Sequence, residues 1–145
     1  MLIYNNLLLT DAEIPDSSIG FLYKITHIPS GKWYIGRKML SVAATKTVKG
    51  KKKKIRKESD WRSYWSSSKH IHQLVESEGE SSLKKEVLLF VDTKACLTLG
   101  EEYLLHVSGA LFDPNCLNEN IRSRIYRTWF KKTPNFFKHL SSVKV

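Results

Sequence analysis

A tight β-hairpin over residues 20–37 is the feature that most limits what this chain can fold into. Its two flanks, 20–26 and 33–37, are rich in the aromatic and β-branched residues that strands favour. Between them, Pro29 presets φ for a first corner, and Gly31 allows a left-handed residue that closes the turn. The pattern therefore predicts two antiparallel strands joined by a short turn.

Each predicted strand carries one tyrosine, Tyr23 in the first and Tyr34 in the second. If the turn centres near Ile28 and Pro29, the tyrosines are equidistant from it and lie opposite each other on one face of the sheet. A bulge at Gly31 would shift this pairing by one residue. Two neighbouring phenols in a strongly basic chain indicate a polar site that acts on phosphate.

The charge balance predicts an anionic partner. The chain has 24 Lys and Arg against 14 Asp and Glu, a net charge of +10. Nucleic acid is the commonest partner of such a protein, and a membrane surface is the alternative. The 145 residues, 41% of them hydrophobic, suffice for one domain with a single core and exclude wholesale disorder.

Several patterns bear on the compartment. No apolar run approaches the length of a membrane span, so none is expected. The apolar start of the chain lacks the basic region and cleavage site of a secretory signal. Cys96 and Cys116 suit reduced thiols better than a disulfide framework, and two cysteines cannot build a Cys-based zinc site. We therefore expect a soluble cytoplasmic protein.

Composition divides the chain into segments. Residues 1–19 form a lead-in, and residues 122–145 form a basic, aromatic tail. Residues 41–60 are a basic insertion in which only Glu58 and Asp60 oppose the cations. Because like charges repel, we expect a flexible loop or a long, exposed β-arm there. This insertion either follows phosphates or is a solvated charge run.

Helical spacing and capping residues indicate the remaining elements. Residues 68–78 have an apolar seam and end at Gly79, which predicts a helix. Residues 83–92 are a near-continuous apolar run and predict a buried central strand. Thr93 or Thr98 can cap a second helix, with the inward residues Leu99, Tyr103, Leu104 and Val107. The expected fold is α/β (α+β), a small three-stranded antiparallel or mixed sheet flanked by helices.

The motif Tyr34-Ile35-Gly36, with Tyr23 eleven residues earlier, resembles the signature of the GIY-YIG nuclease family. The first half departs from it, because Phe21 stands where the family has glycine. The order hairpin, helix, buried strand, glutamate helix and late asparagine supports a catalytic domain over residues 20–121. The tract 58–69 resembles phage-encoded members, which implies a homing-type or freestanding endonuclease acting in the host cytoplasm.

Phosphodiester hydrolysis needs an activated water, charge stabilisation and help for the leaving oxygen. A phenol has an ordinary pKa of about 10, and a neighbouring phenol and a metal cation would stabilise its phenolate. Tyr23 is therefore the candidate general base, and Tyr34 is its hydrogen-bonding partner or a phosphate contact. The alternative is two strand aromatics that only pack a core.

The resemblance implies one Mg²⁺ or Mn²⁺ held by a glutamate, and such hard cations prefer oxygen ligands. Glu101 fits the family spacing best and Glu102 is the alternative, although both could be solvated first-turn acids favoured by the helix dipole. The late asparagine corresponds to Asn118, with Asn120 second, or else to ordinary turn chemistry.

The helix arginine of the family has no counterpart, because Ala44 occupies its position. The candidate substitutes are Arg37 and Lys38 at a strand end, Arg56 in the insertion, and Arg62 on a segment that could begin the first helix. A guanidinium binds phosphate in bidentate fashion, so arginine is the natural choice. For His70, His72 and His106, surface or core packing is the expected role.

Further phosphate contacts are expected from the insertion and the tail. The predicted nucleic-acid-binding residues are Lys38, Lys49, Lys51, Lys52, Lys53, Lys54, Arg56, Lys57, Arg122, Arg124 and Arg127. The tail interleaves its arginines with Tyr126, Trp129 and Phe130, which suits phosphate contact with base stacking. An amphipathic membrane helix is the alternative for this tail.

These features predict a metal-dependent endonuclease that cuts DNA, with RNA as an alternative substrate. The competing function is a catalytically impaired nucleic-acid-binding protein on the same fold, because Phe21 and the missing helix arginine depart from the family. A basic structural protein that meets nucleic acid in an assembly is a third possibility. A double-strand cutter with one active site would need a dimer or two sequential nicks, so the oligomeric state stays open.

Overall fold

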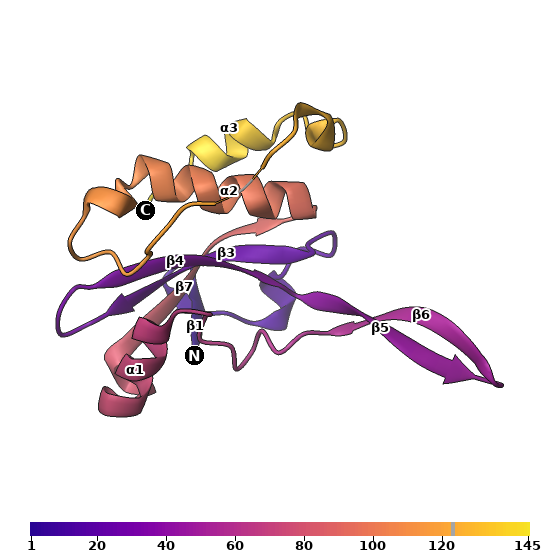
Figure 1. Cartoon of the computed structure of the whole chain (residues 1–145), viewed down its shortest axis with the longest axis horizontal. Helices are drawn as coiled ribbons and strands as arrows, with labels where there is room; N and C mark the ends of the chain where they lie inside the picture. The colour runs from indigo at the N-terminus through magenta and orange to yellow at the C-terminus, as the bar shows by residue number, and fades with distance from the viewer. Residues whose placement is uncertain (123) are drawn as a thin grey trace.

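Figure 1 shows the computed structural model of the chain, which describes residues 1–122 and 124–145. A five-stranded sheet has α2 and α3 on one side and α1 on the other. Its strands, in spatial order, are β2 (Leu7–Leu8), β1 (Leu2–Tyr4), β7 (Leu83–Val91), β3 (Gly20–His27) and β4 (Trp33–Met39). β1 runs parallel to β7, and the other neighbours are antiparallel.

The predicted α+β class is confirmed, and β7 is the central strand as expected. The sheet has five strands rather than three, because part of the lead-in pairs with the free edge of β7. The helices are α1 (Lys69–Glu78), α2 (Lys94–Val107) and α3 (Phe136–Ser141), with 3₁₀ segments at Asp11–Glu13, Glu80–Ser82, Ala110–Phe112 and Arg127–Phe130.

Side-chain caps fix where the two long helices begin. The Ser68 hydroxyl accepts a hydrogen bond from the Ile71 N–H, and the Thr93 hydroxyl accepts one from the Cys96 N–H. The predicted helix up to Gly79 is confirmed, and Thr93 rather than Thr98 caps α2.

Alternation along β3 sends its side chains into two separate cores. Phe21, Tyr23 and Ile25 pack on the α1 side, and Leu22 packs on the α2 side. On α2, Leu104 faces inward as predicted, whereas Val107 is 57% exposed and that part of the prediction is wrong. Val107 is the last residue of α2.

The hairpin register differs from the predicted one. Tyr23 pairs with Gly36, and Tyr34 pairs with Ile25, so the tyrosines are not directly opposite each other. The turn centres between Pro29 and Ser30 instead of one residue earlier, which moves the partner of Tyr23 by two positions. Because side chains alternate with a period of two, both tyrosines still share one face.

The basic insertion forms a hairpin arm, which we define as residues 41–58. It consists of β5 (Ser41–Val48) and β6 (Lys51–Glu58), paired over their whole length. Figure 1 shows this arm extending away from the body of the molecule. Of the two forms expected for the insertion, the structure has the long, exposed β-arm rather than a loop.

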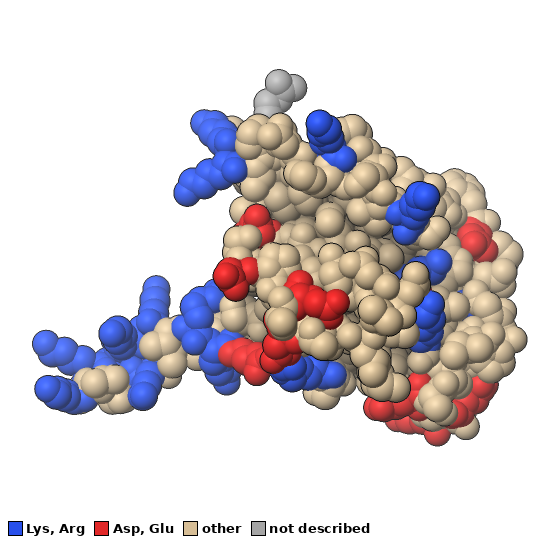
Figure 2. Space-filling view, turned by 180° about the vertical axis from the view of Figure 1, so that it is seen from behind, with Lys and Arg blue, Asp and Glu red and all other residues tan. Residues whose placement is uncertain are grey.

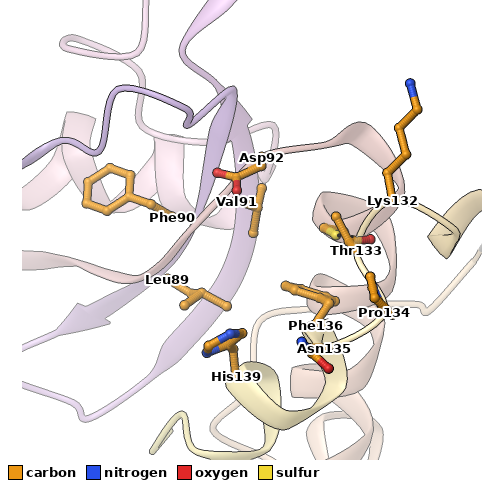
Figure 3. A pocket seen from close by; sticks show the side chains of 11 residues that line it. Leu89, Phe90, Val91, Asp92, Lys132, Thr133, Pro134, Asn135, Phe136 and His139 are labelled. Carbon is orange, nitrogen blue, oxygen red and sulfur yellow. Dashed lines mark hydrogen bonds between the residues drawn. The ribbon is translucent and has the colours of Figure 1, made fainter.

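The tail packs against α2 and the sheet rather than extending into solvent. Leu140 of α3 is fully buried, and a Cβ added to Gly100 of α2 would lie 3.5 Å from the Phe136 ring. A cavity of about 410 Å³ remains between β7 and the tail, where Leu89, Phe136 and His139 gather (Figure 3). It lies on the α2 side, on the opposite side of the sheet from Tyr23.

Cys96 and Cys116 are free thiols, as expected. Among the described helices, none has both the length and the apolar character needed to cross a membrane.

Candidate active site

The Tyr23 side chain lies directly against Gly36 on the neighbouring strand. A Cβ added to Gly36 would lie 2.4 Å from the Tyr23 hydroxyl oxygen and 2.9 Å from the Tyr34 ring. Only glycine therefore admits the phenol at this position without a shift of one of the rings. The ring centroids of Tyr23 and Tyr34 are 6.3 Å apart, so the two phenols are neighbours on the α1 face of the sheet.

Both phenols are protonated in the free protein at neutral pH. Burial is the main cause that raises the pKa of Tyr23, which is 1% exposed, and Tyr34, Tyr64 and the Glu101 carboxylate raise it further. Burial also raises the pKa of Tyr34, against the lowering effect of a hydrogen bond with Ser67. Tyr23 thus needs added positive charge nearby before it can lose its proton.

One positive charge is already present near Tyr23, on a buried lysine. Lys85 of β7 is 4% exposed, its ammonium lies 5.0 Å from the centre of the Tyr23 ring, and it donates a hydrogen bond to the backbone oxygen of Tyr64. The pKa of Lys85 is lowered to about 8, mainly by burial and then by the Lys38 charge, against the raising effect of Asp60.

Sequence reasoning missed Lys85 and Tyr64. The signal for Lys85 was present, because it takes the inward position between Leu83 and Val87 in an alternating strand. No comparable sequence pattern indicated that Tyr64 lies beside Tyr23. Its ring meets the Tyr23 ring edge-on at 6.5 Å, and the Lys38 ammonium lies 3.8 Å above it.

A cleft of about 440 Å³ opens beside Tyr34. It brings together residues from four segments, namely Tyr34 of β4, Ser67 to His70 at the start of α1, Glu101 of α2, and Leu117 to Asn120. Three of the predicted site residues, Tyr34, Glu101 and Asn118, therefore share one cleft although they are far apart in the sequence.

Asn118 joins this cleft to the edge of the sheet. Its Oδ1 accepts a hydrogen bond from the Ile35 N–H at 2.9 Å, and its Nδ2 donates one to the Ile35 carbonyl at 2.8 Å. The side-chain amide thus pairs with β4 as a neighbouring strand would. This contact fixes the 116–118 segment and the rim of the cleft.

Glu101 is the recessed carboxylate of the cleft. Burial raises its pKa, Arg37 lowers it, and Glu102 raises it. The Arg37 Nε lies 3.8 Å from the Glu101 carboxylate, and its guanidinium also donates to the Thr98 hydroxyl at 2.6 Å. The described residues contain no group of three or more His, Cys, Asp or Glu that could hold a metal ion. Mg²⁺ often binds through one or two carboxylates plus water and phosphate, so Glu101 alone fits such an ion.

Arg62 does not reach this cleft. It pairs with Asp11 at 2.9 Å and Glu58 at 2.8 Å, and it stacks on Trp61 at 4.3 Å. Its segment forms a turn, and α1 begins only at Lys69, so the expectation that Arg62 lies on the first helix is wrong. Ala44 lies on the exposed arm, since the insertion separates β4 from α1.

The basic residues at or near the cleft are therefore different from most of the predicted ones. Arg37 contacts Glu101, and Lys69 and His70 at the start of α1 line the cleft, where His70 pairs with Glu119 at 3.0 Å. Lys38 lies near Tyr64 and pairs with Asp60 at 2.5 Å.

The other predicted phosphate contacts lie outside the cleft. Lys49, Lys51, Lys52, Lys53, Lys54, Arg56 and Lys57 are exposed on the arm, which Figure 2 shows as a blue projection. Arg122 and Arg124 are exposed in the tail, and the prediction for the Arg127 side chain lies outside what the structure describes.

The structure places a tyrosine pair and a cleft carboxylate on a mixed sheet, and comparison with known families assigns such a chain to a nuclease-type domain. The family model described as "Putative endonuclease segE, GIY-YIG domain" matches residues 3–122. The chain therefore belongs to the GIY-YIG endonuclease family, whose members are generally dependent on divalent metal ions. No curated protein and no solved structure matches the chain.

Proposed function

We propose that the protein is a divalent-metal-dependent endonuclease that hydrolyses phosphodiester bonds in DNA. The observation that carries this proposal is the contact of Tyr23 with Gly36, which sets the Tyr23 and Tyr34 phenols side by side. A cleft with one recessed carboxylate, Glu101, opens beside Tyr34, the member of the pair that lines it. A proton-transfer group beside a carboxylate that can hold a cation suits phosphodiester hydrolysis.

In this proposal Tyr23 accepts the proton of the attacking water. Because burial raises the pKa of Tyr23, the phenol must first release its own proton to solvent water, and positive charge near the ring would favour that release. The Lys85 ammonium, 5.0 Å from the ring centre, favours the phenolate and is a positioning residue in this scheme. Tyr34 and Lys69 line the cleft where the phosphate would bind.

Glu101 would hold the Mg²⁺ or Mn²⁺, which when bound supplies charge at the phosphoryl oxygens and lowers the pKa of a bound water. Arg37 is the proposed substitute for the helix arginine of the family, because its guanidinium already lies at Glu101. Asn118 acts through the Ile35 backbone and keeps the cleft rim in place.

Nicking of supercoiled plasmid in Mg²⁺ tests the proposal. Tyr23→Phe and Glu101→Gln are each expected to lower the rate about 100-fold or more, the scale of a lost acid–base or electrostatic group. Glu102→Gln, a change of the adjacent acid, is the matched control and should nick like the wild type. Equal nicking by wild type, Tyr23→Phe and Glu101→Gln would refute the catalytic assignment.

A second candidate function is nucleic-acid binding without cleavage. Two observations favour it, namely the raised pKa of Tyr23 and the absence of an arginine in α1. No nicking by any variant, together with a retained gel shift on DNA or on RNA, would support it. If cleavage is found, the ratio of linear to nicked plasmid as protein concentration rises distinguishes a dimer from two sequential nicks.

A further inference from the structure

The arm is a β-ribbon closed by a two-residue turn. β5 and β6 form eight consecutive pairs, from Ser41 with Glu58 to Val48 with Lys51. Lys49 and Gly50 both have positive φ, 51° and 76°, as the tight hairpin turns that match strand twist require. Eight residues at about 3.3 Å each give the ribbon a length of roughly 25 Å. Apart from Ser41, Ala44 and Ile55, the strand residues are exposed.

The charge of the arm opposes its own folding. Between residues 42 and 57 it carries seven lysines and Arg56 and no acid, and with Glu58 at its base the arm supplies +7 of the net +10 of the chain. Lys46 and Lys53 are direct cross-strand partners, an arrangement of like charges that destabilises a strand pair. Within the described chain these lysines have no ion pair. An anionic partner would remove this repulsion.

The cations lie on both faces of the ribbon. The pairing register sets Lys46, Lys51, Lys53 and Lys57 on one face and Lys52, Lys54 and Arg56 on the other. The first face also carries Val42, Val48 and Ile55, whereas the second carries Thr45 and Thr47. A ribbon of this kind can contact phosphates on both sides while one face meets base edges.

We propose that the arm binds in the major groove of duplex DNA, an inference that rests on the proposed nuclease function and names its substrate as B-form duplex. The major groove, about 12 Å wide, admits a two-stranded β-ribbon. The major groove of duplex RNA is too deep and narrow for side chains to read. Single strands are bound largely by stacking on aromatic rings, and residues 41–58 contain no aromatic residue.

The first test blocks the major groove of the DNA with a bulky substituent. Binding is measured by fluorescence anisotropy in EDTA with the Glu101→Gln protein, so that no cleavage occurs. A duplex whose cytosines carry a bulky C5 substituent, which projects into the major groove, should bind at least about tenfold more weakly than the plain duplex. Equal affinity for the two duplexes, or displacement by the minor-groove ligand netropsin, would overturn the proposal.

A matched pair of variants separates the effect of the arm on DNA binding from the effect of the overall charge of the protein. The arm variant carries Lys→Gln changes at Lys51, Lys52, Lys53 and Lys54, and the control carries them at the exposed Lys32, Lys94, Lys138 and Lys144. Both variants lose four charges, but only the arm variant should bind the plain and the C5-substituted duplex with similar affinity. If both variants lose their preference for the plain duplex equally, a groove-specific contact by the arm is contradicted.

Single-stranded DNA and duplex RNA of the same sequence complete the test. Duplex DNA should bind at least about tenfold more tightly than either, and equal affinity for duplex RNA would overturn the proposal. These binding results do not depend on cleavage. Groove-specific binding by a protein that never nicks plasmid would refute the proposed nuclease activity and leave the role of the arm intact.

Discussion

The sheet body and the arm are stabilised in opposite ways. In the body, Phe21, Tyr23 and Ile25 of a single strand are almost completely buried between the sheet and α1. In the arm, most strand residues are exposed, and the strands are joined by their backbone ladder and by hydrogen bonds from the Arg56 guanidinium to Ser41. A two-stranded hairpin without a covered face is marginal in water. The body thus carries the folding free energy, and the arm carries the charge.

If the proposed roles hold, changes in the body should alter catalysis, and changes in the arm should alter substrate affinity. The cleft residues lie on or next to strands and helices that pack in the core. Substitutions there should therefore alter the packing of the body and the geometry of the cleft. The arm joins the body only at the Ser41 and Glu58 end of its ladder. Changes in the arm should therefore alter binding and its salt dependence without altering the unfolding of the body.

The largest effect is expected for Gly36→Ala. The new methyl group would lie 2.4 Å from the Tyr23 hydroxyl oxygen, so the buried ring must shift. A displacement on the order of 1 Å at a reacting group can lower a rate about 100-fold, and overpacking costs about 1–3 kcal/mol of stability. Plasmid nicking and urea unfolding measure the two effects.

Gly100→Ala is the packing control for that variant, because its Cβ would lie 2.6 Å from Leu22 on the other face of the sheet. Gly100→Ala should lose as much stability as Gly36→Ala without the same loss of nicking activity. Full nicking activity in Gly36→Ala would contradict the role assigned to the Tyr23 contact.

Removal of the arm should have the next largest effect. Replacing residues 42–57 with Asn-Gly joins the paired Ser41 and Glu58 through a favourable two-residue turn. We expect DNA affinity at low salt to fall about 100-fold, and the slope of log K against log salt to flatten by about 0.9 for each phosphate that the shortened protein no longer neutralises. The urea midpoint of the body should stay unchanged. A large loss of stability would show that the arm belongs to the folding unit.

Lys85→Met tests a smaller, pH-dependent effect. The pKa of Lys85 is about 8 in the folded protein against 10.5 ordinarily, so between these values the unfolded chain binds more protons and wild-type stability rises with pH. We expect this rise, about 1–2 kcal/mol between pH 8 and 10, to disappear in Lys85→Met. Urea unfolding across that range measures it. Lys84→Met, a change of the exposed neighbour, should keep the rise, and an unchanged rise in Lys85→Met would contradict the assignment.

The smallest effect is expected for Arg62→Gln. Its ion pairs with Asp11 and Glu58 are exposed, and such pairs contribute little to stability. Nicking should stay within about twofold of wild type, and the free energy of unfolding within about 0.5 kcal/mol. A loss of nicking as large as that of Glu101→Gln would show that Arg62 reaches the substrate after all.

Much of the body could be predicted, because its signals are local. Ser68 and Gly79 bracket α1, Thr93 starts α2, and the apolar run ending at Val91 is the central strand. The Tyr34-Ile35-Gly36 motif identified the family, and the positions of Glu101 and Asn118 followed from the resemblance. The exposed form of the arm also followed from its charge.

The rest depends on contacts between distant parts of the chain. The two-residue change in hairpin register depends on where the turn closes, which Pro29 and Gly31 left open. The pairing of β1 with β7 joins residues more than eighty positions apart. The alternation of β7 indicates that Lys85 points inward, but not that Tyr23 is its neighbour. The burial of Leu140 in the core likewise results from packing that no local pattern records.

The contact between Asn118 and β4 has a consequence for solubility. β4 is an edge strand, and open edges invite pairing with another chain and aggregation. Asn115 and Leu117 satisfy the backbone of Trp33, and the Asn118 amide satisfies both polar groups of Ile35. The segment that forms the rim of the candidate cleft therefore also shields this part of the edge from self-association, so we expect a loss of the Asn118 contact to promote aggregation of the protein.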